Sequence, residues 1–283
     1  MNFNKGSDVN RLTLLIIALL FMALLTVSCH YSPWETETSC RDFYQDNLQR
    51  LTKIELATQG QLAFNVAVIS DLHNDLSDIK TAVERINQQK DVAFALVLGD
   101  MTNQGLAIEF EWSCNALAKL EVPRFYVIGN HDGISFGKDV FTKSFAPLDY
   151  AFTYKDVKFI LYNDNAFEFP QAPDYAFLSN EATVQPGEVR RLTIAASHSP
   201  PVTDSHTEEE AAKLRQFLFD YNVNLSLHGH HHVFSYWLDE FNNPHYITSK
   251  VEGGKYGMLF VAENGDISLQ DCAATCKDAT LKN

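Results

Sequence analysis

Carboxylate, imidazole and carboxamide side chains gather in this sequence at the points where short apolar runs end. Four of the ten histidines lie between Leu227 and Val233. The polar groups follow five separate apolar runs, in the order Asp71-Leu72-His73, Gly99-Asp100, Gly129-Asn130-His131-Asp132, His198-Ser199-Pro200-Pro201 and Gly229-His230-His231-His232. Oxygen and imidazole nitrogen together suit borderline divalent metals such as Mn, Fe, Zn, Co or Ni. These residue types therefore predict a metal centre that contains no thiolate.

The elements that carry these groups alternate between strand and helix in the first half of the chain. Apolar patterning predicts, in order, a strand over Phe64–Ser70, a helix over Leu76–Asn87, a strand over Val92–Leu98, a helix over Ala107–Leu120 and a strand over Arg124–Ile128. This order implies a parallel sheet with right-handed crossovers. The carboxyl ends of such strands share one edge, which is where open α/β sheets bind ligands.

The second half is predicted to form further strands, with a more antiparallel arrangement. A capping box of Thr207 and Glu210 precedes a helix over Ala211–Tyr221. The predicted strands are Ala151–Tyr154, Val157–Tyr162, Arg191–Ala196, Leu225–Leu227, Val233–Leu238, His245–Ser249, Gly257–Ala262 and Ile267–Leu269. We therefore expect an α/β fold in which two mixed sheets pack face to face, flanked by helices.

Two metal ions would explain why so many ligand-type residues occur together. Two ions held roughly 3.5–4 Å apart clamp an oxyanion and acidify the water between them. An Asp suits sharing, because each of its two oxygens can face one ion. This chemistry answers the difficulty of attacking a phosphate ester, whose negative charge repels hydroxide.

The ordered motifs Asp-x-His, Gly-Asp, Gly-Asn-His-Asp, a lone His and Gly-His-x-His resemble those of the calcineurin-like metallophosphoesterase family. The family fold is a four-layer α/β/β/α sandwich, which agrees with the patterning above. The resemblance implies that Asp100 bridges two ions. It further implies that one ion is bound by Asp71, His73 and His232, and the other by Asn130, His198 and His230.

The resemblance gives His131 a catalytic role instead of a ligand role. It implies that His131 lies over the site and contacts the phosphoryl oxygen or protonates the leaving group, with Asp132 orienting its ring. The implied reaction is in-line attack by a metal-bridging hydroxide, without a phospho-enzyme. Asn103 stands where the dinuclear purple acid phosphatases carry a metal-bound Tyr, so we do not expect a purple enzyme.

The other histidines are predicted to lie outside the metal centre. We expect His228 to be a core residue or to support a ligand, and His231 to be exposed or to face the substrate. His30, His206 and His245 are expected at the surface.

The first thirty residues have the pattern of an export signal. Lys5 and Arg11 precede an apolar core over 14–25, which is shorter than the roughly 20 residues of a spanning helix. Leu25-Thr26-Val27-Ser28-Cys29 resembles the lipobox of bacterial lipoproteins, in which the Cys is acylated. An uncleaved anchor is the alternative. The predicted parts are therefore a signal peptide (1–28), a tether and helical segment (29–60), a phosphoesterase domain (61–271) and a tail (272–283).

The remaining cysteines are even in number, which suits a compartment that permits disulfides. Three pairings of Cys40, Cys114, Cys272 and Cys276 are possible, and four reduced thiols are a further alternative. Cys272–Cys276 closes the shortest loop, and Cys40–Cys114 would then tie the N-terminal segment to the core. The N-terminal helix itself is predicted to begin after a cap at Ser39.

We therefore predict a hydrolase of small phosphate mono- or diesters, lipid-anchored at a bacterial cell envelope and facing the periplasm or the exterior. The formal net charge of −14 argues against stable binding of nucleic acid. The loops Gly133–Lys138, Phe167–Thr183 and Val202–Thr207 are expected to select the substrate. The alternative function is that of a non-catalytic metal- or nucleotide-binding lipoprotein on the same scaffold.

Overall fold

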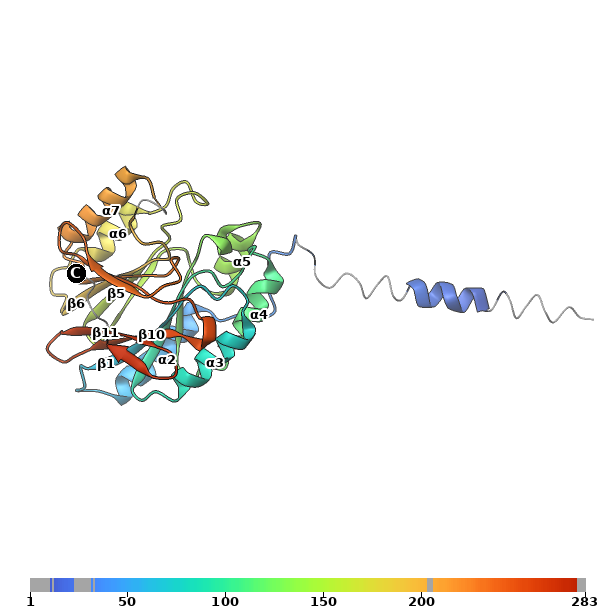
Figure 1. Cartoon of the computed structure of the whole chain (residues 1–283), viewed down its shortest axis with the longest axis horizontal. Coiled ribbons are helices and arrows are strands. Elements are labelled where there is room, and N and C mark those ends of the chain that lie inside the picture. The colour runs from blue at the N-terminus through green and yellow to red at the C-terminus, as the bar shows by residue number, and fades with distance from the viewer. Residues whose placement is uncertain (1–10, 12, 23–31, 33, 203–205, 279–283) are drawn as a thin grey trace, which may run out of the picture. The chain divides into compact units, whose positions relative to one another are not determined.

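Two six-stranded β-sheets form the centre of the described chain from Thr36 onward (Figure 1). The computed structural model describes residues 11, 13–22, 32, 34–202 and 206–278. The first sheet contains, in spatial order, β12 (Cys276–Asp278), β11 (Ile267–Cys272), β10 (Tyr256–Val261), β1 (Phe64–Ile69), β2 (Val92–Leu98) and β3 (Arg124–Val127). The second contains β4 (Tyr150–Tyr154), β5 (Val157–Leu161), β6 (Leu192–Ala196), β7 (Leu225–His228), β9 (Pro244–Ile247) and β8 (Ser235–Leu238).

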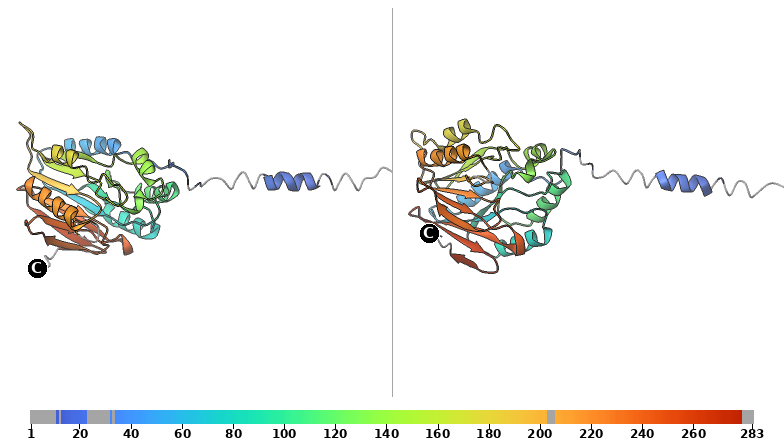
Figure 2. Two further views of the ribbon diagram at one scale, coloured as in Figure 1. Left: turned by 90° about the horizontal axis from the view of Figure 1, so that it is seen from above. Right: turned by 45° about the horizontal axis from the view of Figure 1, so that its top comes forward.

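Helices lie outside both sheets (Figure 2). The helices with the first sheet are α2 (Tyr44–Ala57), α3 (Leu76–Asn87) and α4 (Ala107–Leu117), and α5 (Gly137–Ser144) follows β3. The second sheet is covered by α6 (Tyr175–Ala182) and α7 (Glu208–Asp220), whose buried side chains share a small apolar cluster with that sheet. A larger apolar core fills the space between the sheets. The predicted α/β class with two helix-flanked sheets is confirmed.

The predicted elements of the first half are nearly all present at the predicted positions. The helix α3 and the strand β2 have the predicted bounds, and α4 ends three residues earlier than expected. The capping box of Thr207 and Glu210 begins α7, with both of its hydrogen bonds formed. The helices α5 and α6 were not predicted, because each is short and has a mixed apolar pattern.

The division of the sheets differs from the expected one. The C-terminal strands β10 to β12 return to the first sheet, where β10 pairs antiparallel with β1. The strands β5, β6, β7 and β9 of the second sheet are parallel neighbours, so the second half is less antiparallel than predicted. Local patterning identifies a strand but does not identify its partner, which is decided by packing between distant segments.

The N-terminal helix begins later than predicted. Ser39 does not cap a helix: its backbone N–H and the Thr38 hydroxyl both donate to the Glu111 carboxylate, and α2 begins at Tyr44. Segment 36–60 packs on the core, and β12 extends the first sheet beyond residue 271. Both segments therefore belong to the same compact unit as the predicted phosphoesterase domain.

The described part of the other unit, Met1–Glu35, contains a helix at residues 11 and 13–22. None of the described helices has both the length and the apolar character that crossing a membrane requires. Cys29, the predicted site of acylation, lies outside the described residues.

The four remaining cysteines form two disulfides. Cys40 pairs with Cys114 on α4, and Cys272 pairs with Cys276, which selects one of the three possible pairings. The first disulfide fastens the segment before α2 to the helix that follows β2. The second closes the tight turn between β11 and β12.

A buried ion pair also fastens the N-terminal segment to the first sheet. The Arg124 guanidinium at the start of β3 and the Tyr126 hydroxyl both donate to the Asp42 carboxylate. Burial raises the pKa of Asp42, but the hydrogen bonds and charge of Arg124, helped by Tyr126 and Asn47, lower it below its usual 3.8. Asp42 is therefore ionised and fully paired at neutral pH.

Replacing Asp42 with Asn should lower the free energy of unfolding at pH 7 by about 3 kcal/mol, because Arg124 is left buried without its counter-ion. A depressed pKa stabilises the fold above the unfolded-state pKa, and this contribution is lost as the pH falls through the folded-state pKa. The difference from the wild type should therefore shrink below about pH 4 in denaturant titrations. Glu37→Gln, at the exposed pair with Arg41, should change little. Equal losses of unfolding free energy in Asp42→Asn and Glu37→Gln would contradict a stabilising role for the buried pair.

Candidate metal centre

Parallel strands from both sheets deliver the predicted ligands to one place. Asp71, Asp100 and Asn130 follow β1, β2 and β3, which are parallel neighbours in the first sheet. His198 follows β6 and His230 follows β7, which are parallel neighbours in the second. The two edges are joined directly, because the backbone N–H of His230 donates to both oxygens of Asp71 at 3.1 Å.

The backbone at these strand ends is held in an unusual conformation. Several residues without the freedom of glycine have positive φ values, between 43° and 68°: Asp71, His73, Asp100, His230 and His232. Such conformations cost roughly 1–3 kcal/mol each and persist where surrounding contacts enforce them, which is common at functional sites. All five residues belong to the predicted ligand set.

Glycines precede Asn130 and His230 because neighbouring strand ends, within one sheet and between the two sheets, approach too closely for a side chain. A Cβ on Gly129 would lie 2.2 Å from both the backbone nitrogen and a carboxylate oxygen of Asp100. A Cβ on Gly229 would lie 1.9 Å from the Ser70 hydroxyl. The Gly-Asn-His and Gly-His patterns are therefore requirements of packing as well as of chemistry.

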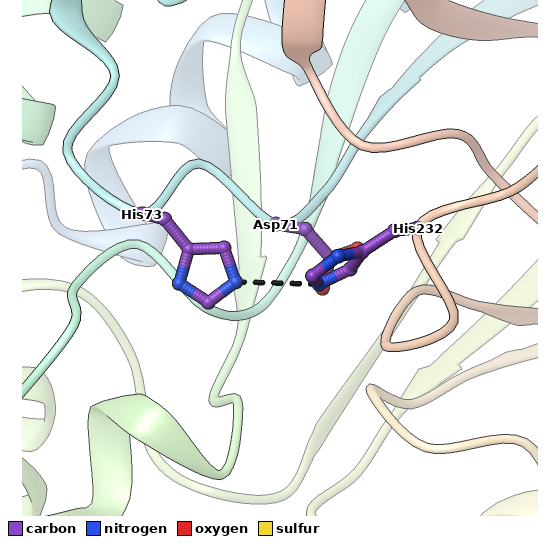
Figure 3. Close-up of side chains that lie close together, drawn as sticks. All are labelled: Asp71, His73 and His232. Carbon is purple, nitrogen blue, oxygen red and sulfur yellow. Dashed lines mark hydrogen bonds and ion pairs between the residues drawn. The ribbon is translucent and has the colours of Figure 1, made fainter.

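The first group of donor atoms consists of Asp71, His73 and His232 (Figure 3). The Nε2 atoms of the two histidines are 3.3 Å apart, and His232 Nε2 is 3.4 Å from Asp71 Oδ1. Figure 3 shows the two rings turned toward each other from separate loops, with the Asp71 carboxylate beside His232.

The second group of donor atoms consists of Asn130, His198 and His230. Asn130 Oδ1 is 3.1 Å from His198 Nε2 and 3.2 Å from His230 Nδ1, and these two nitrogens are 3.3 Å apart. His198 Nδ1 donates to the Leu98 carbonyl at 2.7 Å, which orients the ring with Nε2 toward the group.

Asp100 stands between the two groups. Its Oδ2 atom is 3.6 Å from His73 Nε2 and 3.4 Å from His198 Nε2, and the residue is 1% exposed. The structure thus brings together all seven residues predicted as ligands, and the Asp100 carboxylate faces both groups.

The protonation states fit a cation site. Burial raises the pKa of Asp100, but His198, His131 and His73 lower it to about 2, so the carboxylate is ionised. Burial, followed by the charge of His198, lowers the pKa of His230 to about 4, which leaves a neutral imidazole. Burial lowers the pKa of His198, but Asp100 raises it more, so a divalent ion would compete with a proton for this nitrogen.

The donor set therefore suits two divalent cations. The donor nitrogen and oxygen atoms lie 3.1–3.6 Å from one another, close enough to coordinate a shared cation. All four cysteines among the described residues are in disulfides, so the donors of this site are imidazole, carboxylate and carboxamide. This set fits the Mn, Fe, Zn, Co or Ni predicted from the sequence.

His131 lies beside the first donor group. Its ring meets the His73 ring edge to face, with centroids 4.9 Å apart, and its backbone N–H donates to Asp100 Oδ1 at 3.0 Å. His131 Nδ1 donates to the carbonyl of Asn103 at 2.9 Å. The ring is thus anchored at Nδ1, and Nε2 is left for another group.

Asp132 does not have the contacts expected of it. It was predicted to orient the His131 ring, whereas the carbonyl of Asn103 does so. The Asp132 carboxylate instead accepts from the backbone N–H groups of Met101, Thr102 and Gly129 and from the Thr102 hydroxyl. It is fully buried, and it joins the loop after β2 to the loop after β3. The sequence could not show this contact of Asn103, because it is made by a backbone carbonyl, which every residue has.

Two further histidines were placed wrongly. His206 and His245 were predicted at the surface, yet they are 3% and 0% exposed. His245 Nε2 lies 3.1 Å from Asp239 Oδ2, and its ring stacks on Trp237. His245 lies on β9 within the second sheet, and His206 directly precedes the N-cap residue of α7, which covers that sheet.

The remaining histidines vary in position. His228 is a core residue, as predicted, and its two ring nitrogens lie 3.0 Å from the Ser197 hydroxyl and 2.9 Å from the Ser226 hydroxyl. His231 is partly buried, with its ring 5.7 Å from that of His230. His30 lies outside the described residues.

Comparison with known proteins agrees with this geometry. The family model of the calcineurin-like phosphoesterases matches residues 64–234, well over half of the chain. The chain belongs to the calcineurin-like phosphoesterase family. That match includes all seven candidate ligands together with His131. A search of curated proteins finds no match.

Several solved structures share the fold of the chain at low identity. A purple acid phosphatase from yellow lupin (Lupinus luteus) has a TM-score of 0.60 and 13% identity, over 76% of this chain and 53% of that one. A dimetal phosphatase from Danio rerio has a TM-score of 0.58 and 13% identity, over 77% and 99%. GAP50, described as the anchor in the inner membrane complex of Plasmodium, has a TM-score of 0.57 and 12% identity, over 78% and 90%. The chain thus spans about half of the lupin protein's length.

The full chain should bind two equivalents of Mn²⁺, measured by calorimetry and by elemental analysis after gel filtration. Asp100→Asn should lose tight binding of both ions, because its carboxylate faces both donor groups. His231→Ala is the matched control, since this histidine stands between two candidate ligands in sequence and should leave the stoichiometry at two. Two tightly bound ions in Asp100→Asn would contradict a shared carboxylate.

Proposed function

We propose that the chain hydrolyses a phosphate mono- or diester at a dinuclear divalent metal centre. The observation that carries the proposal is the buried Asp100 carboxylate, which faces His73 on one side and His198 on the other. The match to the calcineurin-like phosphoesterases supports the same chemistry. The expected partner is a small phosphate ester, and no stable binding of nucleic acid is expected.

The chain's own residues supply most of the arrangement that this reaction needs. Two divalent ions, when bound, supply positive charge for the phosphoryl oxygens and acidify water for attack on phosphorus. Asp71, His73 and His232 would hold one ion, and Asn130, His198 and His230 the other, with Asp100 shared. Strained strand ends and the bond from His230 to Asp71 keep these side chains in place before substrate arrives.

His131 is the proposed proton donor to the leaving group. Anchorage of Nδ1 by the Asn103 carbonyl aims the opposite nitrogen away from that loop, and the ring lies beside the donor atoms without belonging to the predicted ligand set. A proton delivered to the departing alkoxide lowers the activation free energy of the reaction, and it does so most when the alcohol is a poor leaving group.

The full chain in detergent should release p-nitrophenol from p-nitrophenyl phosphate or its bis-ester with Mn²⁺ present. Thorough chelation should abolish turnover, and added Mn²⁺ should restore it. Asp100→Asn should lower the rate by several orders of magnitude, since barriers for these esters are among the largest that enzymes lower. Turnover that survives chelation would rule out the mechanism. Stoichiometric metal without turnover of any ester would favour the non-catalytic alternative.

His131→Ala should lower kcat for an alkyl phosphate by about 10²- to 10⁴-fold while the metal stoichiometry stays at two. The loss for a p-nitrophenyl ester should be much smaller, because that leaving group departs without a proton. The comparison of the two esters in one variant controls for damage to the metal centre. Equal losses for both esters would show that His131 does not act on the leaving group.

We also propose that the chain is lipid-anchored at Cys29 in a bacterial cell envelope. The lipobox-like Leu25-Thr26-Val27-Ser28-Cys29 supports this, as do the two disulfides, which suit an oxidising compartment. In detergent phase separation of cell extracts, the wild type should enter the detergent phase and Cys29→Ser the aqueous phase. Ser28→Ala should behave as the wild type. A Cys29→Ser protein that still enters the detergent phase would contradict the lipid anchor.

A further inference from the structure

An open pocket of 860 Å³ lies beside the loop that follows His131. One wall is formed by the loop after His131 and the first turn of α5, and the other by the segment 163–174 between β5 and α6. Two of the loops predicted to select the substrate, Gly133–Lys138 and Phe167–Thr183, thus face each other across one cavity.

Gly133 and Glu168 connect this pocket to the metal centre. Gly133 is two residues beyond His131, and a Cβ there would lie 2.7 Å from the Phe169 ring and 3.2 Å from the Cβ of Glu168. Partial burial raises the pKa of the Glu168 carboxyl, and its charge interacts with those of Asp100, His131 and His198. The pocket therefore begins beside the proposed proton donor, where the leaving group of an ester would lie.

The lining of the pocket is strongly acidic. One lysine, Lys138, accompanies four carboxylates, which belong to Asp139, Asp149, Glu168 and Asp174. Among the described residues, no salt bridge joins any of the four to a cation. An anionic substituent would therefore be repelled here, and a cationic one would be attracted.

Two aromatic rings complete the lining. Phe136 is 38% exposed, and Phe169 packs against Gly133 on the opposite wall. The Phe169 ring already has a cation near it, since Lys138 Nζ lies 6.0 Å from its centroid. Aromatic faces together with carboxylates form the kind of site that binds ammonium groups, including quaternary ones, which cannot donate hydrogen bonds.

We propose that this pocket receives the leaving group of the substrate and that this group is a cationic amino alcohol of the ethanolamine or choline type. The inference rests on the proposed function, because it assigns the substrate class of the same centre. Glu168 is the residue that determines specificity, since it lies both in the pocket and near the metal centre. The aromatic rings add affinity for a methylated ammonium group.

The first test compares phosphate monoesters that differ in charge at nearly constant size. Phosphoethanolamine, 2-hydroxyethyl phosphate and phosphoglycolate carry a cationic, a neutral and an anionic substituent. Phosphocholine and 3,3-dimethylbutyl phosphate form a second pair, of equal shape, and each can also be tested as its methyl diester. We expect kcat/KM to favour the cationic member of each set by about tenfold or more.

The second test removes the charge of the pocket. Glu168→Gln should lower kcat/KM for phosphocholine about tenfold. It should leave kcat/KM for 3,3-dimethylbutyl phosphate unchanged and raise kcat/KM for phosphoglycolate. Glu84→Gln is the matched control, because it removes the same charge from an exposed position on α3. Phe136→Leu keeps the apolar bulk and removes the aromatic face. It should lower kcat/KM for phosphocholine more than for 3,3-dimethylbutyl phosphate.

The outcomes separate this inference from the proposed function. If p-nitrophenyl phosphate and its bis-ester are both inert with Mn²⁺, the proposed function itself fails. If they react while cationic and neutral esters have equal kcat/KM, the substrate class is wrong and the function stands. A charge preference that survives in Glu168→Gln and Phe136→Leu would overturn the assignment to this pocket.

Discussion

One buried carboxylate, that of Asp100, sets the constraint on which the structure around it depends. It faces imidazole nitrogens on both sides, at 3.6 Å from His73 and 3.4 Å from His198, where water is excluded. A buried charge is tolerated when it is paired, and a shared carboxylate is best paired by cations on either side. The parallel strands, the glycines at their ends and the strained backbone all serve to hold donor groups around this position.

Separate parts of the chain hold the loops of the centre together. Asp132 accepts hydrogen bonds from the loops after β2 and β3, and Asp71 accepts from His230 across the two sheets. Farther away, the pair of Asp42 and Arg124 fastens the N-terminal segment to β3. These buried contacts satisfy polar groups that would otherwise be costly, and they make the centre a rigid feature of the fold.

The net negative charge of the chain is distributed unevenly around the candidate metal centre and the pocket. An excess of acidic residues argues against binding polyanions, yet two divalent ions would make the centre itself attractive to a phosphate group. The pocket beyond Gly133 is acidic and aromatic, so a substrate that suits both regions combines an anionic phosphate with a cationic substituent. In this proposal, the metal-binding motifs account for the reaction at phosphorus, and the two loops that line the pocket account for the choice of substrate.

The sequence alone determined the fold class, most strands and helices of the first half, and the identity of the candidate ligands. The elements follow from periodic burial, which is a local property, and the candidate ligands follow from the resemblance of the local motifs to those of a known family. The tertiary structure decided the rest: the return of β10 to the first sheet, the disulfide pairing, the burial of His206 and His245, and the anchoring of His131 by Asn103 instead of Asp132. Each depends on contacts between distant segments, and such contacts leave no periodic pattern along the chain.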